Sequence, residues 1–197
     1  IMREIDRRAI EDYSIPATLL MNNAGKFVAD FIISEFEKTQ IYIFCGTGNN
    51  GGDGFTAAFY LFNAGFSPVV YIAGKREKIG DVSKVFLSIC ESCNIPITYA
   101  TEENLDQIKI PSASLIIDAL TGTGFSGKLA GIALNLVEII NRANATVISV
   151  DIPSGMPSDG NMPDSEFIRS NYTITMGLPK ISLVTYPCKK FCGEVIV

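Results

Sequence analysis

Apolar and polar positions along the chain follow two periods, one typical of strands and one of helices. Short apolar runs typical of buried strands occupy residues 41–45, 69–73, 97–99, 115–117, 147–150, 172–176 and 194–197. Apolar residues at helical spacing mark residues 16–37, 53–64, 81–93 and 132–143. Because strands and helices alternate, we predict an α/β fold: a three-layer α/β/α, Rossmann-like domain with a mostly parallel central sheet.

Length and composition agree with one domain. The 197 residues are 47% hydrophobic and 19% charged, which is enough apolar material for one well-buried core. The sequence contains no internal repeat and no low-complexity linker. The least regular stretch, residues 154–169, is interpreted as one loop with a little helix. We therefore expect residues 1–197 to form a single domain.

Charge and cysteine content argue against several classes of protein. With 16 basic and 21 acidic residues the net charge is −5, so we expect no nucleic-acid partner. No apolar run approaches the length of a membrane span, and residues 2–8 are charged, unlike a signal peptide, so we expect no membrane association. Five cysteines at irregular spacing are typical of reduced thiols. They predict a cytoplasmic location, or a mitochondrial one if a transit peptide has been removed.

A glycine-rich segment directly follows the first predicted strand. Residues 46–54 read Gly-Thr-Gly-Asn-Asn-Gly-Gly-Asp-Gly. We expect these glycines to permit positive φ and to let backbone N–H groups approach a phosphate. The N-terminus of the helix that follows would attract an anion. The pattern Gly46-x-Gly48-x-x-Gly51 also matches the dinucleotide-binding fingerprint.

Two features expected with that fingerprint are missing. A dinucleotide-binding site usually has an acidic residue at the end of the second strand, where this chain has Gly-Lys-Arg at residues 74–76. No Lys-Ser or Lys-Thr pair follows the glycines, which argues against a kinase-like or other nucleotide-binding protein of the Walker type. A tight turn without a ligand is the remaining alternative, but such a turn does not require Asn49, Asn50 and Asp53.

Two further predicted strands also end in polar, glycine-bearing segments, which begin at Asp118 and Asp151. Carboxyl ends of parallel strands lie at one edge of the sheet, where ligands bind at the switch point of the strand order. We therefore expect Asn50, Asp53, Asp118 and Asp151 to converge on one crevice. Taken singly, Asp118 equally fits a helix N-cap and Asp151 a turn aspartate.

The chain contains no histidine. Histidine is the commonest general base and the commonest zinc ligand, so both roles must be filled by other side chains or be absent. Acid–base chemistry in this protein therefore falls to Asp, Glu, Lys or Tyr.

Four motifs follow one another along the chain. They are Gly-x-Gly-Asn-Asn-Gly-Gly-Asp-Gly, Asp-Ala-Leu-x-Gly-Thr-Gly, Val-Asp-Ile-Pro-Ser-Gly and Leu-Pro-Lys. Together they resemble the NAD(P)H-hydrate epimerase family, also called the YjeF amino-terminal domain. The resemblance implies an isomerase that interconverts the R and S epimers of hydrated NADH and NADPH in nicotinamide nucleotide repair. It also implies coupling to a dehydratase that acts on the S form.

The resemblance assigns roles to individual residues. It implies Asp151 and Lys180 as catalytic residues, and Asn50, Asp118 and Ser154 as ligands of one potassium ion per subunit. The substrate contacts it implies come from Asn49, Asn50, Gly51, Gly52, Asp53, Gly122, Thr123, Gly124, Phe125, Ser126, Gly127, Lys128 and Asp151. A carboxylate beside an ammonium group can move protons without histidine, and oxygen donors suit potassium.

The resemblance leaves two arrangements and one alternative function open. The chain is either a stand-alone epimerase or the front fragment of a two-domain enzyme with a dehydratase. The alternative function is a non-catalytic dimeric scaffold or protein-binding module of the same fold. The motif side chains are all present, which favours the enzyme: Asn50, Asp53, Asp118, Asp151 and Lys180.

We also expect a homodimer. The helix predicted over residues 16–37 has an apolar stripe that is wider than one sheet face needs: Leu19, Leu20, Ala24, Phe27, Val28, Phe31 and Ile32. Two-fold contact with a second copy is the commonest way to cover such a patch. The alternative is that the whole stripe packs on its own sheet.

Overall fold

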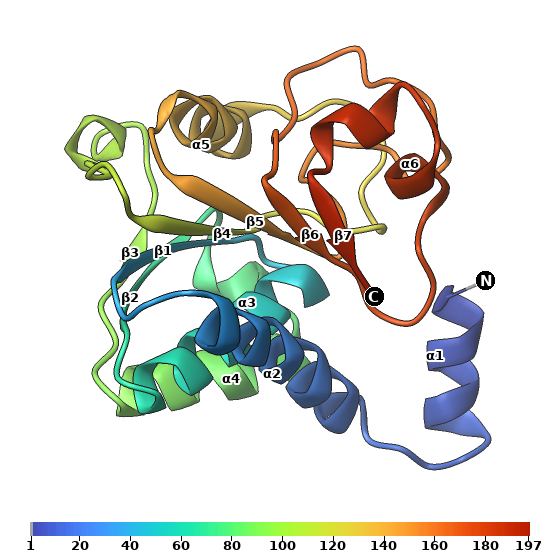
Figure 1. Ribbon diagram of the computed structural model, residues 1–197. Helices are drawn as coiled ribbons and strands as arrows, with labels where there is room; N and C mark the ends of the chain where they lie inside the picture. Colours follow the sequence, from blue (N-terminus) through green and yellow to red (C-terminus); the bar gives the residue numbers. More distant parts are fainter. Residues whose placement is uncertain (1) are drawn as a thin grey trace.

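Seven parallel strands form the centre of the molecule, in the order β3-β2-β1-β4-β5-β6-β7 (Figure 1). The structure is a computed structural model, and it describes residues 2–197, with side chains from residue 4. The strands are β1 (Gln40–Cys45), β2 (Ser67–Ile72), β3 (Ile97–Tyr99), β4 (Leu115–Ala119), β5 (Thr146–Val150), β6 (Tyr172–Ile174) and β7 (Glu194–Ile196). The strand order changes direction between β1 and β4, which is the switch point where ligands bind in such sheets.

Helices cover both faces of the sheet, as predicted. On one face lie α2 (Ala17–Glu35), α3 (Asn49–Asn63) and α4 (Asp81–Ser92), and on the other lie α5 (Gly131–Arg142) and α6 (Ile181–Val184) (Figure 1). Three short 3-10 helices complete the structure: η1 (Arg76–Lys78), η2 (Leu105–Gln107) and η3 (Cys188–Phe191). All five residues of β4 are buried, because a parallel sheet between two helical layers has no solvent-facing side.

Adjacent residues of β1 contribute to two different hydrophobic cores. Ile43 belongs to the core under α2 and α3, together with Phe55. Phe44 belongs to the core under α5, together with Leu136. Successive side chains of a strand point to opposite faces, and each of these four is fully buried. Full burial of one such side chain contributes about 1.5–3 kcal/mol, so the two cores hold the helical layers on the sheet.

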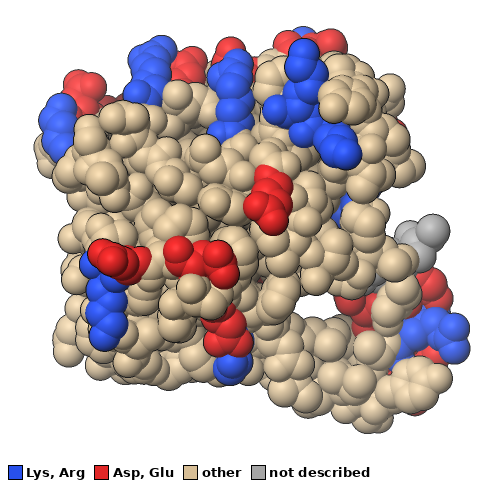
Figure 2. Space-filling view, viewed as in Figure 1, with Lys and Arg blue, Asp and Glu red and all other residues tan. Residues whose placement is uncertain are grey.

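Two α-helices were not predicted: the single turn of α6 and the longer α1. Residues 2–11 form α1 (Met2–Glu11), which stands away from the rest of the molecule, and Figure 2 shows an opening between the two. Among the described side chains of α1, none is buried. Ion pairs one turn apart, such as Arg7–Glu4 at 2.6 Å and Arg8–Asp12 at 3.1 Å, support the helix. The charged sequence gave no apolar stripe from which to predict it.

The structure allows a search for membrane spans and shows the state of the cysteines and of the least regular stretch. Across residues 2–197, no helix is long and apolar enough to cross a membrane. All five cysteines are free, and Cys90 is buried on the core-facing side of α4. The stretch at residues 154–169 is a loop, as predicted, but the little helix expected in it is wrong, since it contains neither helix nor strand.

Candidate active site

A cavity of about 1160 Å³ lies where β1, β4, β5 and β6 end. Nine of the residues expected from the sequence line it: Asn49, Asn50, Asp53, Gly122, Thr123, Gly124, Phe125, Asp151 and Lys180. They come from segments far apart in the chain, and the parallel sheet brings them together because each follows the carboxyl end of a strand. The cavity is therefore the candidate active site.

Asp151 and Lys180 form an ion pair in this cavity. Lys180 Nζ donates to Asp151 Oδ1, and also to Thr175 Oγ1 at 2.7 Å and to Met176 O at 3.3 Å. The side chains are 18% exposed for Asp151 and 8% for Lys180. Because little water reaches the pair, its charges interact more strongly than in solvent. Both groups can exchange protons with a ligand in the cavity.

The backbone at Asp151 adopts a left-handed conformation, with φ of +68°. This conformation is unfavourable for most residues with a side chain, although aspartate and asparagine tolerate it best. The Asp151 N–H donates to Ile174 O at 2.7 Å, which holds the turn against β6. Strained residues held by their surroundings gather at functional sites, and here the turn fixes the carboxylate in the cavity wall.

Asp118 does not line the cavity, so the prediction that it converges there with Asn50, Asp53 and Asp151 is wrong: its side chain is completely buried. Its carboxylate accepts hydrogen bonds from Ser149 Oγ at 2.7 Å, Ser154 Oγ at 2.5 Å, Ser154 N at 2.9 Å and Leu120 N at 3.3 Å. Burial raises the pKa of the Asp118 carboxyl above its usual range, and the bonds it accepts from Ser154 and Ser149 oppose the rise. Asp118 thus ties the end of β4 to the turn after β5.

Asn50 carries an unsatisfied oxygen next to this anchor. Its Nδ2 donates to Thr121 O at 3.0 Å, while its Oδ1 is buried and has no hydrogen-bond partner among the described residues. A Cβ atom at Gly122 would lie 3.3 Å from this oxygen, so the glycine leaves space beside it. Ser154 Oγ accepts from Thr121 N at 2.8 Å and has one lone pair left. An unpaired carbonyl oxygen and a hydroxyl near a buried carboxylate are donors that suit an oxygen-preferring cation.

Asp53 is the third acidic group of the site. Burial raises the pKa of its carboxyl well above the usual range, and the neighbouring Asp151 and Asp6 carboxylates raise it further. Asp6, on α1, also lines the cavity, and its pKa is raised by burial and by Asp151. Three carboxyl groups near one ammonium group favour protonation of the most buried of them.

The glycine-rich segment differs from its prediction. The helix α3 begins at Asn49 and not at Asp53, and none of the five glycines at residues 46–54 has a positive φ. All but Gly48 are needed for close packing: a Cβ at Gly46 would lie 1.9 Å from Leu120 O, and one at Gly51 would lie 2.0 Å from Gly46 O. The N-terminus of α3 nevertheless opens onto the cavity, through Asn49 and Asn50, as expected.

Several expected substrate contacts do not line the cavity. Gly51 and Gly52 are buried inside the packing of α3. Ser126, Gly127 and Lys128 lie exposed on the outer part of their loop, where Lys128 Nζ is 3.9 Å from Asp164 Oδ2. Of the segment 122–128, only the first four residues line the cavity, and its contact with a substrate stays a prediction.

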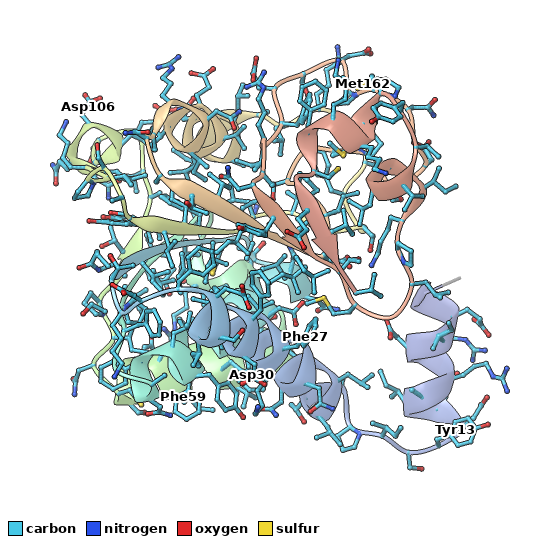
Figure 3. The ribbon with its side chains drawn as sticks, viewed as in Figure 1. Tyr13, Phe27, Asp30, Phe59, Asp106 and Met162 are labelled. Carbon is cyan, nitrogen blue, oxygen red and sulfur yellow. The ribbon has the colours of Figure 1, made fainter. Side chains whose placement is uncertain are left out.

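The sequence did not reveal that α1 and α2 complete the cavity. Asp6 and Ile10 of α1 line it, and so do Leu20, Ala24 and Phe27 of α2. Phe27 lies on α2 and Tyr13 lies at the turn that follows α1, away from the cavity (Figure 3). The only sequence signal was that the apolar stripe of α2 is too wide for the sheet, and part of its excess covers the cavity.

Comparison with known proteins shows the family of the chain. The family model described as YjeF-related protein N-terminus matches residues 17–182. An NAD(P)H-hydrate epimerase of Rhodopirellula baltica is 34% identical over 197 residues, covering 100% of this chain and 80% of that protein. A bifunctional NAD(P)H-hydrate repair enzyme, Nnr, of Moorella thermoacetica is 34% identical, covering 100% of this chain and 38% of that protein. The crystal structure of yeast ynu0, YNL200c, has a TM-score of 0.82 at 23% identity and covers 98% of this chain and 83% of that chain.

The fold and the site define a doubly wound α/β domain with a carboxylate–ammonium pair at its switch-point cavity. The yeast structure shares this fold. The chain belongs to the family of YjeF-related N-terminal domains, which confirms the resemblance found in the sequence. It spans 38% of the Moorella bifunctional relative and 37% of the Thermofilum pendens one.

Proposed function

We propose that this chain is an NAD(P)H-hydrate epimerase, an isomerase that interconverts the R and S epimers of hydrated NADH and NADPH. The observation that carries the proposal is the Asp151–Lys180 ion pair at the wall of the strand-end cavity. Relatives that carry the name NAD(P)H-hydrate epimerase support it, at 34% identity in Rhodopirellula baltica and 30% in Oenococcus oeni.

The pair supplies the acid and the base that an epimerisation needs. Carbon 6 of the hydrated nicotinamide ring carries a hydroxyl group and is bonded to the ring nitrogen. Asp151 accepts the hydroxyl proton while Lys180 donates a proton to the ring nitrogen, so the C–N bond breaks and an aldehyde forms. Rotation and the reverse proton transfers close the ring on the other face. No electrons leave the substrate, and both residues return to their starting states.

We further propose that one potassium ion binds beside this pair. Asn50 Oδ1 and Ser154 Oγ would be its protein ligands, and Asp118 would balance its charge while orienting Ser154. The support is the buried Asn50 oxygen without a partner and the oxygen-only character of the donors. A cation held by these groups would supply positive charge at the wall of the cavity.

The expected partners and location also remain proposals. Relatives named as bifunctional repair enzymes support coupling to a dehydratase that uses the S form. A homodimer is supported by apolar side chains that α1 and α2 leave exposed, namely Ile5 at 46%, Leu19 at 47% and Phe27 at 38%. Five free cysteines support the cytoplasm as the compartment.

The proposal is tested with the purified R epimer of hydrated NADH. We expect the S epimer, measured by chromatography, to accumulate until the two epimers reach equilibrium. Spontaneous interconversion is subtracted with a sample of heat-denatured protein. A rate equal to that control would contradict the epimerase and favour the scaffold alternative.

A further inference from the structure

A second cavity lies beside the active site and has no part in the chemistry described above. Its volume is about 760 Å³, and it is formed by the ends of β2 and β3 and by the N-terminus of α5. Ala73 and Ala133 line both cavities, so the two are neighbours along one edge of the sheet. β3 and β5 are four strand spacings apart in the sheet order, which is about 19 Å. Together the cavities suit an extended ligand.

The lining of the second cavity combines an apolar floor with polar groups at its rim. Ala100, Ile132 and the ring of Tyr99 provide flat, apolar surface that fits a base. Glu77 and Glu102 also line it, and their carboxylates accept hydrogen bonds from ribose hydroxyls or an exocyclic amino group. An apolar surface for a base and acceptors for a ribose together fit an adenosine.

Positive charge at the rim of the second cavity favours an adenosine that carries an additional phosphate over one that does not. Lys75 lines the cavity, is exposed, and has no ion-pair partner among the described residues. Arg76 is less available, since its guanidinium pairs with Glu91, one contact being 3.0 Å. The first turn of α5, which reaches the rim, contains no acidic residue and no side-chain cap. Its free N–H groups also favour an anion.

We propose that the second cavity binds the adenosine half of the substrate and that Lys75 binds a 2′-phosphate on it, so that the hydrated NADPH is preferred over the hydrated NADH. The inference rests on the proposed epimerase function for the other half of the ligand. In doubly wound folds the segment after the second strand reads the adenosine ribose, and a cation there accommodates a 2′-phosphate. The pyrophosphate would then lie at the N-terminus of α3, between the two cavities.

A binding experiment tests the cavity without using catalysis. Calorimetry measures the affinity for adenosine 2′,5′-bisphosphate and for adenosine 5′-monophosphate. We expect the wild type to bind the bisphosphate about tenfold more tightly, and Lys75→Ala to remove that difference. Lys78→Ala, an exposed lysine three residues away that does not line the cavity, is the matched control and should keep it. Equal affinities in the wild type, or an unchanged preference in Lys75→Ala, would overturn the role of Lys75.

A second pair of variants tests the location of the adenosine. Thr101 lies at the exposed rim, so Thr101→Trp should fill the cavity and weaken both probes about tenfold, while Thr101→Val should leave them unchanged. Melting temperatures report whether the variants fold. Unchanged probe binding in a folded Thr101→Trp would overturn the location.

Kinetics with three hydrates separates this inference from the proposed function. Thr101→Trp should raise KM for the NADH and NADPH hydrates without changing kcat, and should not affect the hydrated mononucleotide, which lacks adenosine. If the wild type epimerises all three hydrates but Thr101→Trp changes none of the KM values, the second cavity does not bind adenosine, and the epimerase function is unaffected. If the wild type epimerises none of them, the proposed function itself fails, whereas probe binding still reports on the cavity.

Discussion

Two aspartates at neighbouring strand ends have opposite surroundings. Asp118 is fully buried and accepts four hydrogen bonds, so its carboxylate holds parts of the protein together. Asp151 accepts a hydrogen bond from the Lys180 ammonium group and lines the cavity. Only the second arrangement leaves a carboxylate free to exchange a proton with a ligand.

Asp151→Asn should abolish epimerisation and leave the fold intact. The amide keeps the shape of the carboxylate and tolerates the left-handed backbone at this position, but it does not exchange a proton at neutral pH. We expect the turnover rate to fall by about 10²–10⁴-fold. The variant should still unfold cooperatively, at a lower melting temperature because Lys180 loses its counter-charge. Near wild-type turnover would remove Asp151 from the mechanism.

Potassium should stabilise the wild type through Asn50 and the groups around Asp118. A ligand that binds only the folded state raises the melting temperature, so the wild type should melt higher in potassium than in an ion-free buffer. Asn50→Ala should lose that response. Asp118→Ala should have a lower melting temperature than the wild type in both buffers, because the buried groups that donate to Asp118 lose their acceptor. The difference from the wild type should be larger in potassium. Equal differences in the two buffers would limit Asp118 to a structural role.

Asp53 should make stability depend on pH. Its pKa in the folded state lies well above the ordinary value of 3.8, so the folded protein binds more protons than the unfolded chain between those two values. Stability therefore falls as pH rises through this window. Asp53→Asn lacks the effect, so it should become progressively more stable than the wild type from pH 4 to pH 8, measured by urea unfolding. A constant difference across this range would contradict the raised pKa.

At the scale of whole elements, hydrophobic periodicity predicted the sheet and the helices that pack on it. The runs at 41–45 and 115–117 became β1 and β4 because buried parallel strands are continuously apolar. The same reasoning missed α1, whose support is charged pairs on its own surface. It also placed the start of α3 too late, since glycines and asparagines favour loops until tertiary packing requires them in a helix.

Two glycines of that segment allow the packing explanation to be tested. Gly51→Ala should destabilise the protein by about 1–3 kcal/mol, because the new Cβ would lie 2.0 Å from Gly46 O, a backbone atom that has little room to move. Gly48→Ala is the matched control: no atom lies within 4 Å and its φ of −88° suits alanine. Urea unfolding of both variants measures the difference. If Gly51→Ala were as stable as Gly48→Ala, close packing would not explain the motif.

At the scale of the candidate site, the sequence predicted which strand ends meet but not what closes the cavity. Asp151 directly follows β5, and Asn50 and Asp53 lie in the first two turns of α3, just after β1, so the parallel topology brings them together. Asp6 and Ile10 reach the cavity through the path of the linker between α1 and α2, which no periodic pattern encodes.

At the scale of the whole molecule, α1 is too isolated to be stable by its own contacts. A ten-residue helix is marginal in water, and Ile5 and Ile10 of α1 are 46% and 40% exposed. We expect a second copy to cover these side chains, so that light scattering at micromolar concentration gives about twice the chain mass of 21.3 kDa. A mass near 21.3 kDa would contradict the homodimer.

Both ends of the chain border the candidate active site. Asp6, on α1, and Val197, just after β7, line the same cavity although they come from opposite parts of the sequence. A bulky group attached beside Asp6 or Val197 would therefore lie next to the cavity and compete with the substrate. The exposed turn around Met162 lies on the opposite side of the molecule, which makes it the better position for a label or a surface tether (Figure 3).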